Sequence, residues 1–369
     1  MTSEFFASFD RSRPVVAALS GGVDSAVAAG LAKQAGLQVI GITMRLYDAA
    51  GSTASSGGRC CGPRDIEDAR RVAAHLDIPF YVADYEAEFN AHVIDDFVRE
   101  YQSGRTPNPC ARCNQHIKFT PLLRRARALG AQALLTGHYA RLIGPVGDRR
   151  LCRAVDPHKD QSYFLFHMPR AAWDQVHFPL GDLTKDEVRV LAHRLGLHNA
   201  DKPESQEICF VPDGDYAAFV DKRIGERPGS IVDEQGQVLG EHRGVHNFTI
   251  GQRRGIGIGS PGGPLYVLRV VPESQQVVVG HTPLAERTLI VDELTDLPEL
   301  PMQGLAVQVQ IRYRHPAQPA TLFRLDAQRV KVELETPERS PAAGQAAVFY
   351  RDQEVLGGGF IRSTGSLEH

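Results

Sequence analysis

A short apolar run at residues 15–19 leads directly into the string Ser20-Gly21-Gly22-Val23-Asp24-Ser25, and a helical pattern follows at residues 24–35. A buried parallel strand commonly ends in a polar turn of this kind. Two adjacent glycines let the backbone turn tightly and approach a ligand closely. The free N–H groups and positive dipole at the start of a helix favour phosphate. The string therefore predicts a phosphate-binding loop between a strand and a helix.

The side chains of this loop agree with that interpretation. Ser20 and Ser25 add hydroxyl donors, whereas Asp24 would repel phosphate unless it held a cation, which suggests Mg²⁺. The alternative is an ordinary corner between a strand and a helix. The string is neither a Gly-Lys-Ser/Thr P-loop nor Gly-x-Gly-x-x-Gly, but six such residues in this position favour the functional interpretation.

The rest of the first half alternates between strand-like and helix-like segments, which indicates βαβ units and a parallel sheet. Strands are expected at residues 37–43, 79–84 and 133–137, with helical patterns at 66–76 and 89–101. From about residue 210 glycine, proline and short β-branched runs dominate, as in small barrels or sandwiches. We predict an α/β protein with a Rossmann-like domain (1–212), a small central β-rich domain (213–285) and a C-terminal β-barrel (286–365).

Composition excludes several other classes. Of the 369 residues, 42% are hydrophobic and 23% are charged, which is ordinary for a globular protein and wrong for a disordered one. No apolar run approaches the ~18 residues of a membrane span, and we expect no membrane association. The net charge of −3 argues against a protein held to nucleic acid by overall charge, but a local basic surface is compatible with it.

The six cysteines are too few for a disulfide scaffold, and we expect no signal peptide and a reducing, cytoplasmic compartment. Cys110 and Cys113 form a C-x-x-C pair, with a helix expected to begin near Cys113. Cys209 lies close to the predicted domain boundary. Each can be a small buried hydrophobe, but together the three offer an open ligand set that also suits a 4Fe–4S cluster. Cys60 and Cys61 are spaced poorly for chelation, and incidental thiols are the better interpretation.

Several strings together carry a resemblance to known enzymes. The loop at residues 20–25 resembles that of the PP-loop ATP pyrophosphatases, which transfer AMP to a carbonyl oxygen and release pyrophosphate. Along essentially its whole length the chain is similar to the tRNA-specific 2-thiouridylases (MnmA/TrmU family). The matching strings lie at residues 20–25, 104–119, 136–139, 159–165, 208–210, 249–259, 312–314, 344–350 and 356–359.

The resemblance implies a role for each matching site residue. The residues implied to hold ATP are Ala18, Leu19, Ser20, Gly21, Gly22, Val23, Asp24, Ser25, Met44 and Gly137. Those implied to lie against the target base are Asn108, Pro109 and Cys110. Those implied to contact tRNA are His138, Lys159, Asp160, Gln161, Arg312, Tyr313 and Gln345. Cys209 would carry a persulfide, and Cys113 would be its partner nucleophile.

The implied activity is ATP-dependent 2-thiolation of the wobble uridine of tRNA, making the chain a tRNA-uridine 2-sulfurtransferase. ATP and Mg²⁺ would be used, and a cysteine desulfurase or sulfur-relay protein would supply the persulfide. Some family members have Asp where this chain has Cys110. Either that role is filled otherwise, or Cys110 joins Cys113 and Cys209 around a 4Fe–4S cluster.

Two further interpretations remain open at this point. One is a different PP-loop adenylating synthetase, although nothing in the generic loop requires paired cysteines and no separate ammonia-producing domain is evident. The other is a metal-bound RNA-binding protein whose phosphate loop is vestigial. Pyrophosphate release that depends on tRNA discriminates among these functions.

Overall fold

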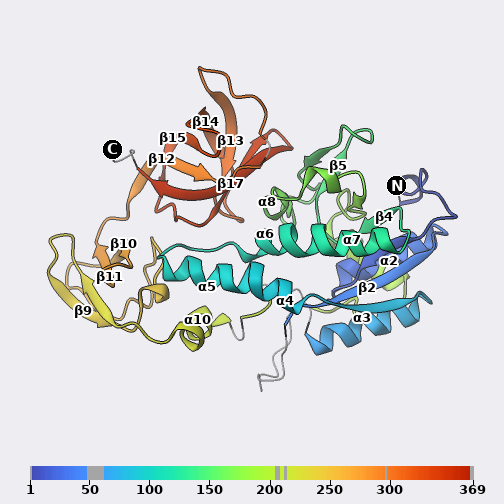
Figure 1. Cartoon of the computed structure of the whole chain (residues 1–369), viewed down its shortest axis with the longest axis horizontal. Coiled ribbons are helices and arrows are strands. Elements are labelled where there is room, and N and C mark those ends of the chain that lie inside the picture. Colours follow the sequence, from blue (N-terminus) through green and yellow to red (C-terminus); the bar gives the residue numbers. More distant parts are fainter. Residues whose placement is uncertain (1, 48–61, 204–207, 212–213, 296, 366–369) are drawn as a thin grey trace. The chain divides into compact units, whose positions relative to one another are not determined.

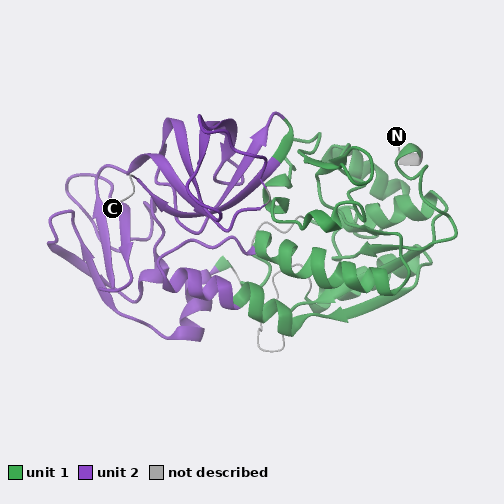
Figure 2. Ribbon diagram, turned by 45° about the horizontal axis from the view of Figure 1, so that its top comes forward, with its two compact units in different colours: residues 1–94, 110–214, 353–355 green, residues 95–109, 215–352, 356–369 purple. Residues whose placement is uncertain are grey.

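The computed structural model (Figure 1) describes residues 2–47, 62–203, 208–211, 214–295 and 297–365. The chain divides into two compact units (Figure 2): unit 1 comprises residues 1–94, 110–214 and 353–355, and unit 2 comprises residues 95–109, 215–352 and 356–369. Cys60 and Cys61 lie outside the described residues. The domain limits at 212 and 285 stay a prediction.

Unit 1 is built on a five-stranded parallel sheet with the strand order β3-β2-β1-β4-β7, which confirms the parallel sheet predicted from the sequence. Val15 lies opposite both Val39 and Ala133, so β1 is the central strand. The strands are β1 (Val15–Ala18), β2 (Val39–Arg45), β3 (Phe80–Asp84), β4 (Ala133–Leu135) and β7 (Val176–His177).

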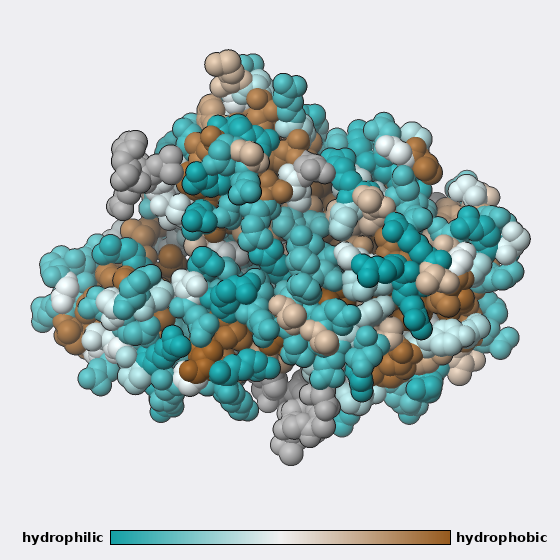
Figure 3. All heavy atoms as spheres, in the orientation of Figure 1, coloured by the Kyte–Doolittle hydropathy of each residue, from teal (hydrophilic) through white to brown (hydrophobic). Residues whose placement is uncertain are grey.

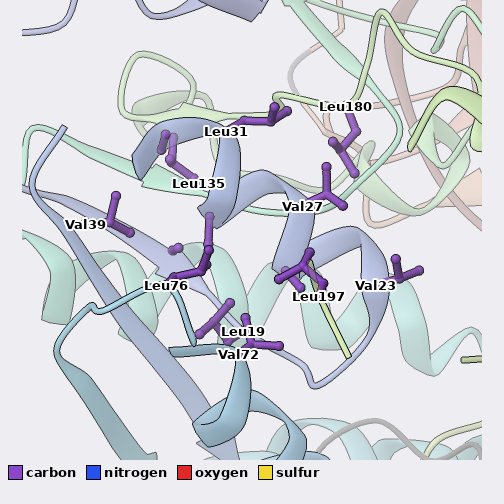
Figure 4. Packing of buried hydrophobic residues seen from close by; sticks show 14 of the residues in the cluster. Leu19, Val23, Val27, Leu31, Val39, Val72, Leu76, Leu135, Leu180 and Leu197 are labelled. Atoms are coloured by element: carbon purple, nitrogen blue, oxygen red, sulfur yellow. The ribbon is translucent and has the colours of Figure 1, made fainter. Parts of the chain in front are cut away.

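Helices cover this sheet, and nine of the 12 residues of helix α2 (Val23–Gln34) are buried. Its apolar residues, among them Val27 and Leu31, pack with Val39, Val72 and Leu197 in one cluster (Figure 4). The other helical elements of unit 1 are α1 (Thr2–Phe5), α3 (Pro63–His75), α4 (Glu86–Phe89), η1 (Asn90–Ile94), α6 (Pro109–Cys113), η2 (Asn114–Leu122), α7 (Leu123–Ala128), α8 (Ser162–Leu165), η3 (Arg170–Ala172) and α9 (Lys185–Arg194).

The helix of the C-x-x-C segment begins earlier than the sequence analysis predicted. It starts at Pro109 rather than near Cys113, which is the last residue of α6 and continues into the π-helical η2. Proline is favoured in the first turn of a helix because its missing N–H has no intrahelical partner there. Cys110, not Cys113, therefore lies in the first helical turn.

Unit 2 contains helices α5 (Asp95–Gln102) and α10 (Tyr216–Ile224), the short η5 (Val245–Asn247) and two β structures. The first is a four-stranded sheet with the order β10-β11-β8-β9. It packs Ile231, Val267 and Val277 into its own core. Its strands are β8 (Gly229–Val232), β9 (Val238–His242), β10 (Tyr266–Val271) and β11 (Gln276–Gly280).

The second β structure is a six-stranded barrel with the order β12-β15-β14-β13-β16-β17, closed by pairing of β12 with β17. Its interior is filled by residues such as Val291, Leu322 and Phe349, which confirms the predicted C-terminal barrel. The strands are β12 (Ala285–Asp292), β13 (Leu305–Gln310), β14 (Gln318–Arg324), β15 (Val330–Arg339), β16 (Ala346–Arg351) and β17 (Glu354–Thr364).

The first residues of β17 belong to unit 1, where Glu354 pairs with Cys152 of the hairpin formed by β5 (Arg141–Ile143) and β6 (Arg150–Cys152). On the face drawn in Figure 3 hydrophilic side chains predominate and apolar ones form small, separate groups. Within the described part of the chain, no helix is long and apolar enough to cross a membrane.

Candidate active site

The predicted phosphate loop lies at the carboxyl end of the central strand of the unit 1 sheet. The strands that follow β1 in the chain, β2 and β3, lie on one side of it, whereas β4 and β7 lie on the other side. The carboxyl end of β1 is therefore a topological switch point. Ligands of open α/β sheets bind outside the carboxyl ends of the strands at such a point. Leu19 remains tied to the sheet, because its N–H donates to the carbonyl oxygen of Ile42 at 2.8 Å.

The two serines of the loop fix its shape from inside. The hydroxyl of Ser25 accepts from the N–H of Ser20 at 3.1 Å and donates to the carbonyl oxygen of Gly22 at 3.0 Å. The hydroxyls of Ser20 and Ser25 lie 3.2 Å apart. Gly22 caps helix α2 without a side-chain hydrogen bond, so the first N–H groups of that helix have no side-chain cap. These groups are suited to an anionic ligand.

Glycine is required at Gly21 and Gly137 for two different reasons. Gly21 has φ +74°, and a Cβ there would clash with the carbonyl oxygen of Asp65 at the start of α3. Gly137 follows β4, and a Cβ there would lie 2.6 Å from the backbone nitrogen of Ser25. Backbone therefore approaches backbone on both sides of the loop, and neither contact has room for a side chain.

The structure brings the ten residues implied to hold ATP to one sheet edge. Ala18 ends β1 and continues into the loop, whereas Gly137 follows β4 and touches the loop from the other side. Met44 is 6% exposed and lies near the end of β2, paired with Ala83 of β3.

Asp24 is neutralised by a residue that the sequence analysis missed. Its Oδ1 accepts a hydrogen bond from the ammonium group of Lys185 at 2.7 Å and another from the hydroxyl of Tyr139 at 2.8 Å. The Lys185 side chain is 8% exposed, and it extends from the first residue of α9, directly after the N-cap residue Thr184, which forms a capping box with Glu187. The sequence contained no local signal for a contact between residues so far apart.

A second missed group braces the loop from behind. The carbonyl oxygen of Gly21 accepts from the side-chain amide of Asn199 at 3.1 Å and from the ammonium group of Lys202 at 3.3 Å. Lys202 also donates to Asp65 at 2.9 Å and to Asp68 at 2.7 Å. Partial burial acts against its charge, but the hydrogen bonds to these carboxylates raise the pKa of Lys202. The phosphate loop is thus fastened to the start of α3.

His138 follows the loop-contacting glycine and is held as a neutral ring. Burial, together with the adjacent Lys118 ammonium, lowers the pKa of His138 well below its usual range. Its Nδ1 lies 2.7 Å from the hydroxyl of Thr136, and its Nε2 lies 3.4 Å from the Lys118 nitrogen. Because an ammonium group only donates, Nε2 accepts and Nδ1 carries the proton.

The segment at 159–161, implied to contact tRNA, is joined to the segment between β4 and β5 that carries His138. Gln161 and Tyr139 exchange backbone and side-chain hydrogen bonds at 2.8 and 3.0 Å. The Asp160 carboxylate accepts hydrogen bonds from within the protein. Its donors are Arg153, Ser162 and the N–H of Ala154. Asp160 therefore shapes this loop. His138, Lys159 and Gln161 lie in or beside it.

The remaining residues implied to contact tRNA belong to unit 2. Arg312 donates to the carbonyl oxygens of Arg339 and Ser340, at 3.0 and 2.5 Å. Tyr313 follows it, and the carbonyl oxygen of Tyr313 accepts from Gln310 at 2.7 Å. The side-chain amide of Gln345 donates to the carbonyl oxygens of Thr106 and Pro107 at 3.0 and 3.3 Å.

This last contact places Gln345 beside the segment implied to face the target base. The N–H of Thr106 donates to the carbonyl oxygen of Ala343 at 2.7 Å, and a Cβ at Gly344 would also strike Thr106. Asn108 and Pro109 continue this segment, and Asn108 is 7% exposed. Thr106 and Pro107, which precede α6 in the chain, are therefore held by residues 343–345, the loop just before strand β16.

The cysteines are not brought together as a ligand set. Cys110 is exposed, Cys113 is buried and Cys209 is half-buried, and none of them is part of a disulfide in the structure. Among the described residues no three His, Cys, Asp or Glu side chains are grouped to hold a metal ion. Cys110, Cys113 and Cys209 therefore do not fit a 4Fe–4S cluster here, and we derive no step through one.

Three sequence families match successive parts of the chain. They are described as the tRNA methyl transferase HUP domain (residues 13–213), the tRNA methyl transferase PRC-barrel domain (217–281) and the aminomethyltransferase beta-barrel domain (286–361). The tRNA-specific 2-thiouridylase MnmA of Geobacter metallireducens is 51% identical over 94% of this chain and 96% of its own length. The chain belongs to the tRNA-specific 2-thiouridylase family. The MnmA protein of Rhodospirillum centenum is also 51% identical, over 94% of this chain and 91% of its own.

Solved structures show a weaker likeness than these 2-thiouridylase sequences do. An NH3-dependent NAD synthetase from Campylobacter jejuni is 20% identical and covers 55% of this chain and 72% of its own, with a TM-score of 0.34. A superposition this weak supports neither a shared substrate nor a shared mechanism.

Proposed function

We propose that the chain is an ATP-dependent tRNA 2-thiouridylase that modifies the wobble uridine. One observation carries the proposal: a PP-loop lies at the switch point of the sheet, in a chain that is 51% identical to proteins named 2-thiouridylases along nearly its whole length. A uracil carbonyl oxygen is a poor leaving group, and transfer of AMP to it gives a good one.

The first half-reaction is adenylation at the phosphate loop. The O2 atom of the uridine attacks the α-phosphate of ATP, and pyrophosphate leaves. We assign the binding of the nucleotide phosphates to the loop backbone, to Ser20 and Ser25, and to the N-terminus of α2. Asp24 is the loop carboxylate that would hold Mg²⁺, which when bound neutralises phosphate charge, and Lys185 is a second cation at the same carboxylate.

The second half-reaction delivers sulfur. A persulfide on Cys209, loaded by a cysteine desulfurase or a sulfur-relay protein, carries a nucleophilic outer sulfur. This sulfur attacks C2, AMP leaves, and the Cys113 thiolate then attacks the Cys209 sulfur, so that 2-thiouridine departs and a Cys113–Cys209 disulfide forms. Alternatively, the Cys113 thiolate attacks the Cys209 sulfur of the persulfide first. The Cys113–Cys209 disulfide then forms at this stage, and the released hydrosulfide attacks C2. In both routes an external thiol must reduce the disulfide.

We assign substrate binding to the residues for which the resemblance implies it. We assign the target base to Asn108, Pro109 and Cys110. The residues assigned to the tRNA backbone and bases are His138, Lys159, Gln161, Arg312, Tyr313 and Gln345, with Asp160 positioning its loop. A uridine unstacked from the anticodon loop is the form that a protein can reach at C2.

The test is to incubate the protein with tRNA, ATP, Mg²⁺, cysteine and a cysteine desulfurase, and to search digested tRNA for 2-thiouridine by mass spectrometry. The proposal predicts 2-thiouridine only when ATP is present, and pyrophosphate release that depends on tRNA. Pyrophosphate release driven by another acceptor would instead indicate a different adenylating synthetase. No release and no thiouridine from folded protein would refute the proposal.

A further inference from the structure

The main chain at Cys209 is anchored, although this cysteine lies next to a stretch of chain outside the described residues. The hydroxyl of Tyr47 donates to the carbonyl oxygen of Cys209 at 2.8 Å. The next residue, Phe210, is 4% exposed and packs edge-on against Phe89, with ring centroids 5.6 Å apart. The Tyr47 ring in turn lies 6.5 Å from the ring of Phe89.

These contacts form a closed circuit within unit 1. The rings of Tyr47 and Phe210 both contact Phe89. The hydrogen bond from Tyr47 to Cys209, the residue before Phe210, closes the circuit. Phe89 is fully buried at the end of α4, so the circuit rests on the core. A cysteine main chain held by both a hydrogen bond and its neighbour's ring has few conformations left to sample.

The anchor comes from the strand that also carries a residue of the nucleotide site. Tyr47 stands two residues beyond β2, the strand of Met44, and Leu46 between them is 2% exposed. Strand β2 pairs directly with β1, which continues into the phosphate loop. The backbone of Cys209 is thereby linked, through Tyr47 and the end of β2, to the carboxyl ends of the strands where the phosphate loop lies.

We propose that Tyr47 is a positioning residue for sulfur transfer, whose hydroxyl holds the Cys209 main chain at the sheet edge where the uridine is adenylated. This inference rests on the proposed function. Tyr47 donates to the carbonyl oxygen of Cys209 and so acts through the main chain of the cysteine. Reacting atoms must be held about 3–3.5 Å apart, and small displacements are costly. Sulfur transfer therefore depends on this hydroxyl, whereas adenylation does not.

Tyr47→Phe tests this, because it removes the hydroxyl and keeps the ring against Phe89. Three quantities are measured in the full-length protein: pyrophosphate release with tRNA and ATP but no sulfur donor, the persulfide on Cys209 by mass spectrometry, and 2-thiouridine in a single turnover. We expect the 2-thiouridine rate to fall about threefold to tenfold, as for loss of one hydrogen bond. Pyrophosphate release and persulfide loading should stay within about twofold of the wild-type values.

Tyr81→Phe is the matched control. Tyr81 lies on the neighbouring strand β3 and is 53% exposed, so removal of its hydroxyl should change none of the three quantities. The inference would be overturned if Tyr47→Phe formed 2-thiouridine at the wild-type rate, or if its pyrophosphate release fell as much as its 2-thiouridine formation. Either result would leave the proposed function standing. Wild-type protein that forms no 2-thiouridine would instead remove the proposed function, and this inference with it.

Discussion

The predicted phosphate loop differs from the two cysteines that we propose to react, Cys113 and Cys209, in how far contacts within the chain fix its arrangement. The loop is interlocked: Ser20 and Ser25 bond each other, Gly137 closes on the loop, and Lys202 ties it to α3. Cys113 and Cys209 lie on separate segments, with no disulfide between them. In the proposed reaction, the nucleotide site is therefore formed by the fold itself, whereas sulfur transfer also requires a persulfide on Cys209 and a bound base.

The largest effect is expected from Gly137→Ala, which breaks the loop and leaves the thiols intact. The new Cβ would lie 2.6 Å from the backbone nitrogen of Ser25 and 2.7 Å from the carbonyl carbon of Asp24. Neither atom can move without the loop. Because displacement of a site by about 1 Å costs on the order of 100-fold, pyrophosphate release should fall by at least about 100-fold.

Loading of persulfide onto Cys209 should be unaffected in this variant, and mass spectrometry of the protein checks it. Gly259→Ala is the control, because its Cβ would meet nothing within 4 Å. Tight ATP binding and normal pyrophosphate release by Gly137→Ala would show that the loop is not the nucleotide site.

Acid should weaken the sheet beneath the loop through His177 of β7. Burial, followed by the nearby Arg149, lowers the pKa of His177 from 6.5 to about 4. Between these values the unfolded chain binds a proton that the folded chain does not, so the free energy of unfolding falls as the pH falls. The full loss is about 3 kcal/mol, at about 1.4 kcal/mol per pKa unit.

His177→Phe should remove most of this acid loss, because the ring already packs against Phe5 and Phe9. Urea unfolding at pH 7 and at pH 4.5 measures it, with the exposed His315→Phe as the control. Equal acid destabilisation of wild type and His177→Phe would assign the effect to other groups.

A smaller effect, shared by both half-reactions, is expected from the double substitution Arg253→Ala with Arg254→Ala. Both arginines are exposed on a turn between Gly251 (φ +85°) and Gly255 (φ +72°), and Gln252 stiffens it by accepting from Thr249 and donating to Arg254. If both contact phosphates, tRNA affinity should fall about tenfold and the slope of log K against log salt by about 1–2.

Filter binding across a salt series measures this change. Pyrophosphate release and thiouridine formation should fall together at low tRNA and recover together at saturating tRNA. Arg329, paired with Asp326 at 2.7 Å in the same unit, provides Arg329→Ala as the control. An unchanged salt slope would exclude these arginines from the tRNA surface.

Local sequence signals predicted the parts of this fold that depend on neighbours in the chain. The apolar strand before Ser20, the tight turn at Gly21 and Gly22 and the helix that follows this turn all depend on short-range rules. The helix starts at Pro109, four residues before Cys113, because proline suits the first helical position, where its missing N–H has no intrahelical partner.

Contacts between distant residues were beyond these rules. Nothing near Lys185 indicates that it pairs with Asp24, and nothing near Tyr47 indicates that it holds Cys209. Both contacts arise where separate segments meet at the carboxyl edge of one sheet. The resemblance named the reacting groups, but only the structure gives the residues that hold them.

The most direct measurement compares the two half-reactions in Cys113→Ser, Cys209→Ser and the wild type, with pyrophosphate release and 2-thiouridine formation followed in the same samples. A built-in nucleotide site predicts that both serine variants release pyrophosphate with tRNA at near wild-type rates and form no 2-thiouridine. Thiouridine from either variant, or loss of pyrophosphate release in both, would contradict the separation of the two sites.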